Sequence, residues 1–141
     1  MNIILSCASD KKKSRGAVII SKGGRRVVEE SFSLICREGG ITLKEYMFET
    51  LIKGLKLVGD YINHDDLLLI EVSNRHMVDW LNGSQEYKDY NSYLDEVYSI
   101  LESLDCRYLF TVSNVKEAKK LLEVVKEEKL EGIADAFEGL L

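Results

Sequence analysis

The sequence predicts an α/β fold built on one mixed five-stranded sheet with helices on both faces. The first 35 residues read as three short strands in succession, joined by polar turns. Helical patterns then alternate with apolar runs, which is typical of strands joined by helical crossovers. An apolar run at residues 67–72 leads directly into one of these helical patterns. Strands joined in this way are expected to lie parallel, with right-handed connections.

Three antiparallel strands are expected over residues 2–7, 17–21 and 26–35. Gly23 and Gly24 separate the second strand from the third, and both positions of a two-residue hairpin turn need the positive φ that glycine accepts. Apolar and polar residues alternate only imperfectly along the third strand, which is expected at the edge of a sheet. The three strands therefore predict an antiparallel meander.

One helix is expected on either side of the apolar run at residues 67–72. The first is expected from Thr42 to about residue 58, because Thr42 and Glu45 have the spacing of a capping box and an apolar stripe follows them. The second is expected after Ser73 and Asn74, whose side chains can accept hydrogen bonds from the free N–H groups at a helix start.

The remaining chain predicts a helix over residues 92–104, a strand over residues 107–112 and a last helix capped by Ser113. The apolar spacing of the last helix can be followed to the chain end, so residues 126–141 are expected to form a C-terminal helical extension. No internal repeat, low-complexity tract or linker interrupts the chain. A single domain over residues 1–141 is therefore expected.

Composition narrows the class of protein. The 141 residues are 45% hydrophobic and 30% charged, with a net charge of −5, which argues against a dedicated duplex-binding protein with a basic face. Cys7, Cys36 and Cys106 lack metal-ligand spacing and are expected to be reduced thiols of a cytoplasmic protein. No signal peptide, membrane span, phosphate-binding loop or zinc motif is recognisable, so no cofactor, metal ion or membrane association is expected.

Five stretches, in chain order, carry a resemblance to a known family. They are LSCAS (5–9), GAVII (16–20), TLKEYMFETLIKGL (42–55), VSNRHMVDWL (72–81) and VKEAKKL (115–121). They cover the end of the first strand, the second strand, the first helix, the fourth strand with its following helix, and the last helix. Along nearly its whole length the sequence thus resembles the ribonuclease H family, and the resemblance implies a ribonuclease H-like fold.

That family cleaves the RNA strand of a hybrid with two Mg²⁺ ions held by four carboxylates. The four matching positions here carry no carboxylate: they are Cys7, Met47, Ser73 and Lys119. Mg²⁺ requires charged oxygen ligands, so the two-metal mechanism is not expected. The leading hypothesis is a catalytically inactive pseudoenzyme that works by binding. Glu71 with Asp10 could still hold a metal weakly, which leaves a divergent metal-dependent ribonuclease H as an alternative.

Two ligand sites are candidates. Ser73, Asn74 and Lys119, near a helix start, could bind a phosphate-bearing small molecule. Six basic residues, expected on loops around the first hairpin, could instead bind a hybrid without cleaving it. They are Lys11, Lys12, Lys13, Arg15, Arg25 and Arg26.

A reactive thiol is a weaker candidate. Cys7, His76 and Asp79 could be drawn as a nucleophilic triad, but a helix would point His76 and Asp79 to different faces. If Lys119 lies beside Cys7, as the family geometry implies, its charge could activate the thiol. A buried structural cysteine is the preferred interpretation.

A protein partner is the leading expectation, with the chain acting as a regulator or an inhibitor, including one carried by a mobile element. The apolar stripe of residues 130–141, within the C-terminal extension, must be buried, either on its own domain or on a second copy. The second arrangement would make a homodimer through the C-terminal extension.

Overall fold

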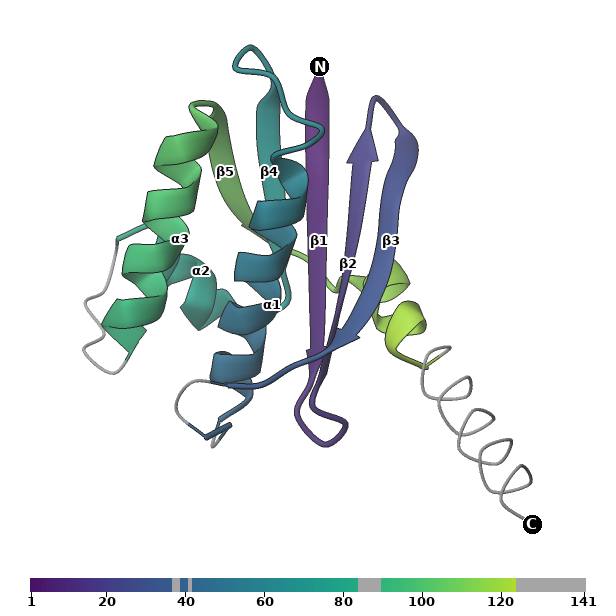
Figure 1. The fold of residues 1–141 in the computed structure, drawn as a ribbon, viewed down its shortest axis with the longest axis vertical. Coiled ribbons are helices and arrows are strands. Elements are labelled where there is room, and N and C mark those ends of the chain that lie inside the picture. Colours follow the sequence, from purple (N-terminus) through teal and green to yellow (C-terminus); the bar gives the residue numbers. More distant parts are fainter. Residues whose placement is uncertain (37–38, 41, 84–89, 124–141) are drawn as a thin grey trace.

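The structure, a computed structural model, describes residues 1–36, 39–40, 42–83 and 90–123 (Figure 1). The labelled elements, in chain order, are β1 (Asn2–Asp10), β2 (Arg15–Lys22), β3 (Arg25–Ser33), α1 (Leu43–Val58), β4 (Leu67–Val72), α2 (Arg75–Leu81), α3 (Asn91–Leu104) and β5 (Arg107–Val112). A further helix, called here the last described helix, covers residues 116–123.

The five strands form one sheet in the order β3-β2-β1-β4-β5. β1, β2 and β3 pair antiparallel, whereas β1, β4 and β5 pair parallel. The predicted mixed sheet is thus confirmed, with β3 at one edge as expected. The first hairpin is longer than predicted, because pairing continues to Asp10 and Arg15 on either side of a short turn.

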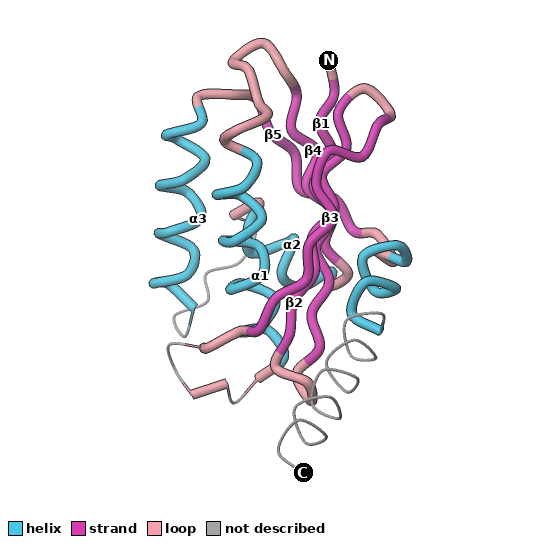
Figure 2. Tube along the Cα trace, turned by 45° about the vertical axis from the view of Figure 1, so that its right-hand side comes forward, coloured by secondary structure: helices cyan, strands magenta, loops and turns pink. Residues whose placement is uncertain are grey.

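Helices cover both faces of the sheet, as predicted. α1, α2 and α3 lie on one face and the last described helix lies on the other (Figure 2). Each face has its own core. The larger core packs the three labelled helices against the sheet. The smaller one joins Ala8, Ala17 and Ile19 of the sheet to Ala118 and Leu122 of the last described helix.

The helix starts expected from the sequence are found close to their positions. The Thr42 hydroxyl accepts a hydrogen bond from the Glu45 N–H (3.4 Å), and Asn74 Oδ1 accepts one from the Met77 N–H (3.0 Å). Ser113 was expected to cap the last helix, but it accepts from the Val115 N–H and the helix begins only at residue 116. The local patterns therefore place helix starts within about two residues.

Two predictions depend on residues outside these ranges. The C-terminal extension, residues 126–141, falls in the part that the structure does not describe, so the extension and the homodimer built on it stay predictions.

None of the helices in the described ranges is long and apolar enough to cross a membrane.

Candidate functional site

Two of the four positions matched to carboxylates lie inside the main core. Cys7 on β1 is 4% exposed and Met47 on α1 is 6% exposed, and both belong to the same cluster of buried apolar side chains. Burial raises the pKa of the Cys7 thiol, and the nearby charge of Glu71 raises this pKa further. Cys7 is therefore a buried, neutral thiol.

The other two matched positions are exposed on different elements. Ser73 follows β4, and Lys119 lies on the last described helix. Because that helix packs on the face opposite α1, the expected placement of Lys119 beside Cys7 is wrong. The thiol thus lacks the positive neighbour that activation would require. His76 is also exposed, away from the core that holds Cys7, which disfavours the triad.

The structure gives the residues of the suggested anion site other roles. The Asn74 side chain caps α2, which has seven residues. Lys119 lines a recess of about 360 Å³ with Lys116 and Lys120 on its own helix. The expected grouping of Ser73, Asn74 and Lys119 therefore has no support from the contacts of the described residues.

The six basic residues do not form one patch, contrary to expectation. Lys11–Lys13 lie in the turn after β1, whereas Arg25 and Arg26 begin β3 at the opposite end of the sheet (Figure 1). The eight residues of β2 separate the two turns by about 25 Å. Arg15 is buried and donates a hydrogen bond to the Ser33 hydroxyl (3.2 Å).

Two of the remaining cations in this set have acidic partners. Lys13 forms an ion pair with Asp10 (3.5 Å). Arg26 binds Glu29 (2.8 Å) and Glu117 (3.2 Å), and these hydrogen bonds raise the pKa of its guanidinium. Lys13 and Arg26 are therefore engaged by carboxylates of the chain itself.

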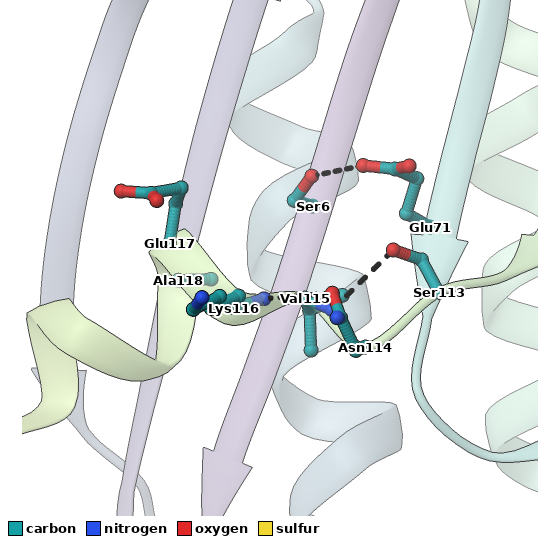
Figure 3. A pocket seen from close by; sticks show the side chains of 8 residues that line it. All are labelled: Ser6, Glu71, Ser113, Asn114, Val115, Lys116, Glu117 and Ala118. Atoms are coloured by element: carbon teal, nitrogen blue, oxygen red, sulfur yellow. Dashed lines mark hydrogen bonds between the residues drawn. The ribbon is translucent and has the colours of Figure 1, made fainter.

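The polar pocket of the sheet lies between β1, β4 and the segment that follows β5. Its volume is about 170 Å³, and its lining side chains are labelled in Figure 3. The Ser6 hydroxyl donates a hydrogen bond to Glu71 Oε1 (2.5 Å). Ser113 and Asn114 form the opposite wall, where Ser113 Oγ accepts from the Val115 N–H and Asn114 Oδ1 accepts from the Lys116 N–H.

Sequence reasoning named Glu71 but missed Ser6, its partner. The two residues are directly paired in the parallel register of β1 and β4, and their side chains lie on the face opposite α1. Alternation along β1 could have placed Ser6 and Cys7 on opposite faces. The partner of Ser6 could not be predicted, because the register of two parallel strands depends on contacts 65 residues apart.

The acids near this pocket diverge. Glu117 points away from Glu71 (Figure 3), toward Arg26 and Lys120, and these partners lower the pKa of its carboxyl. Asp10 is four residues beyond Ser6, about 13 Å further along β1, and binds Lys13. Within the described ranges, no three His, Cys, Asp or Glu side chains are grouped to hold a metal ion.

The burial of Cys7 predicts that the three thiols differ in their rate of alkylation. All three are free, and Cys36 and Cys106 are partly exposed. Burial raises the pKa of both, so they should react slowly with iodoacetamide at pH 8, whereas Cys7 should react only after unfolding. Peptide mass spectrometry with and without urea measures this. Labelling of native Cys7 at the rate of Cys106 would contradict the assignment of Cys7 to the core.

Comparison with known proteins gives structural matches only. No protein-family model matches the sequence, and no curated protein matches it. LC11-RNase H1 in complex with an RNA/DNA hybrid is similar with a TM-score of 0.67 and 14% identity, covering 84% of this chain and 89% of that one. RNase H1 from the archaeon Halobacterium salinarum has a TM-score of 0.65 and 19% identity, covering 85% and 92%.

The N-terminal RNase H domain of a Mycobacterium tuberculosis protein has a TM-score of 0.67 and 11% identity, covering 85% of this chain and 89% of that one. At such low identities, the similarity establishes the fold and not the activity. The structural similarity and the observed strand order agree, and they show that this protein has a ribonuclease H-like fold.

Proposed function

We propose that this protein is a catalytically inactive ribonuclease H-like protein that works by binding, with a protein or a phosphate-bearing molecule as its partner. The observation that carries the proposal is the burial of Cys7 and Met47 in one apolar cluster. These residues occupy two positions where the family resemblance implies carboxylates. A thiol and a thioether in a core offer Mg²⁺ neither charge nor hard oxygen.

The surrounding acids support the same proposal. Glu71 accepts the Ser6 hydroxyl, and Glu117 and Asp10 are paired with cations in other directions. A two-metal mechanism needs carboxylates that converge on ions about 4 Å apart. Among the residues that the structure describes, no three His, Cys, Asp or Glu side chains converge in this way.

A hybrid-cleavage assay tests the proposal. We expect no turnover of an RNA/DNA hybrid above the protein-free blank with either Mg²⁺ or Mn²⁺, while an active ribonuclease H cleaves the same preparation. Metal-dependent cleavage that is lost in Glu71→Ala and kept in Glu102→Ala, a change of an exposed glutamate on α3, would contradict it. That result would favour a divergent metal-dependent ribonuclease H.

Nucleic-acid binding without cleavage is a second candidate. One structural neighbour was determined with an RNA/DNA hybrid, and the turn of Lys11–Lys13 offers three adjacent cations here. Phosphate contacts of this kind weaken steeply as salt rises. Replacing Lys11, Lys12 and Lys13 together by glutamate should abolish salt-dependent retention of labelled hybrid. Arg25→Glu, a single charge reversal at the other end of the sheet, should leave retention largely unchanged and controls for position.

A further inference from the structure

The two edges of the sheet differ in charge. β3, at one edge, carries Arg25, Arg26, Glu29 and Glu30 among nine residues. Charged side chains on an edge strand oppose pairing with another chain. β5, at the other edge, reads Arg-Tyr-Leu-Phe-Thr-Val, with one charged residue and neither proline nor glycine. β5 thus lacks the protection that β3 has.

Large apolar side chains are exposed on both faces of β5. Tyr108, Leu109 and Val112 are 42%, 50% and 43% exposed. Tyr98 of α3 is 37% exposed, and its pKa is raised by burial first and then by the nearby Tyr108, which places the two side chains close together. Isolated apolar side chains on a surface are ordinary, but a group of them along an unpaired strand edge marks a contact surface.

A lateral row of apolar residues leads to this edge. Ile4 of β1 is paired with Leu69 of β4, and Leu69 is paired with Leu109 of β5. The three residues lie on the face opposite α1, where the last described helix packs instead over Ala8, Ala17 and Ile19. Ile4 and Leu69 are partly covered, and Leu109 is the most exposed of the three. The exposure of the row is therefore greatest at Leu109, on the edge strand.

We propose that β5 pairs antiparallel with β5 of a second copy, which joins two sheets into one across a two-fold axis. β5 pairs with β4 along one side, and the strand order gives it no described neighbour on the other. The backbone N–H and C=O groups on that side can complete a ladder with a second strand. This inference does not depend on whether the protein cleaves or binds nucleic acid.

The sequence of β5 suits pairing with itself. In a register centred on Phe110, each Tyr108 lies opposite Val112 of the second copy, and each Leu109 lies opposite Thr111. Aromatic residues opposite β-branched ones stabilise antiparallel pairs. The two Arg107 side chains fall at opposite ends of the paired strands, about 20 Å apart, so they do not repel strongly. A two-fold contact of this kind closes on itself.

The strand geometry favours a second copy over the C-terminal segment as the occupant. Residues 126–141 carry a helical apolar spacing with Gly132 and Gly139 and no β-rich run. If the segment is helical, as this spacing predicts, it cannot complete the backbone ladder of an edge strand. A homodimer through that segment remains a separate hypothesis, and the experiment distinguishes the two.

Sedimentation equilibrium of the full chain tests the inference. We expect the mass of a dimer in the wild type and a dissociation constant raised about ten-fold or more in Leu109→Lys. Val27→Lys is the matched control, because Val27 is also an exposed apolar residue (38%) on an edge strand. It lies on β3, at the opposite edge from β5, so the dissociation constant should not change. Circular dichroism verifies that both variants are folded.

Two further measurements separate the alternatives. Amide hydrogen exchange should show protection of β5 that increases with protein concentration. A full-length variant with Ile133→Glu and Phe137→Glu should remain a dimer. A monomeric wild type at about 100 μM, well above a micromolar dissociation constant, would overturn the inference. A dimer lost in the Ile133/Phe137 variant but kept in Leu109→Lys would also overturn it, in favour of the C-terminal segment.

Discussion

Replacing Cys7 by aspartate should destabilise the domain by about 4 kcal/mol at pH 7 rather than rebuild a metal site. The side chain at this position is buried in an apolar cluster with Met47, and Glu71 lies close enough to add a like charge. A carboxyl in this place is expected to have a pKa raised by about three units, since burial and the neighbouring acid both disfavour ionisation. Each unit corresponds to about 1.4 kcal/mol.

The sign of the pH dependence follows from this raised pKa. Below about pH 4 the carboxyl of Cys7→Asp is protonated in both the folded and the unfolded chain, so the charge makes no contribution there. Above pH 4 the unfolded chain ionises first, and the variant loses about 1.4 kcal/mol of stability per pH unit until the folded-state pKa is passed. Urea unfolding between pH 4 and pH 8, relative to the wild type, measures this slope.

Ser73→Asp is the matched control. Ser73 occupies another position matched to a carboxylate, but it is exposed and lies just before the start of α2. A negative charge is tolerated there, so the free energy of unfolding should change by less than about 0.5 kcal/mol. A Cys7→Asp variant as stable as Ser73→Asp, with a melting temperature raised by Mg²⁺, would contradict the pseudoenzyme proposal. That result would mean that a carboxylate at position 7 can bind Mg²⁺ in the folded protein.

The sequence predicted the strand and helix order because those signals are local. Gly23 and Gly24 mark a hairpin, Thr42 and Glu45 mark a helix start, and each needs only a few neighbouring residues. The five matched stretches added the sheet topology through the resemblance. The sequence could not reveal the exposed apolar edge at β5, because exposure of Leu109 depends on which strands become neighbours.

Two predicted groupings of site residues, Lys119 beside Cys7 and Lys11–Lys13 beside Arg25, do not agree with the structure, because each depended on where side chains or turns point. A residue-by-residue match places Lys119 at a position of the chain, but one residue along a helix rotates the side chain by about 100°. Lys119 is consequently exposed, whereas Ala118 packs on the sheet. The predicted antiparallel meander already argued against grouping Lys11–Lys13 with Arg25. Successive turns of an antiparallel meander lie at opposite ends of the strands, so these cations could have been separated from the sequence alone.

Gly16→Ala should destabilise the domain by about 3 kcal/mol, because α1 packs directly on this residue of β2. A Cβ atom on Gly16 would lie 2.3 Å from Thr50 Oγ1 and 2.9 Å from Phe32 Cε2. Thr50 is fully buried, and its hydroxyl donates to the Tyr46 carbonyl (2.8 Å) and shares a hydrogen bond with Ser9 (2.7 Å). It cannot turn away without leaving buried polar groups unsatisfied.

Chemical denaturation of three variants separates this close approach from a general effect of glycine replacement. Gly59→Ala is the control, because Gly59 has a helical φ of −54° and its Cβ would meet no atom closer than 3.5 Å. That change should be neutral or stabilise by up to about 1 kcal/mol. Adding Thr50→Ala to Gly16→Ala should recover part of the loss, since the shortest contact is removed. If Gly16→Ala alone proved as stable as Gly59→Ala, α1 would have to lie further from β2, and the core that encloses Cys7 and Met47 would be looser than its burial implies.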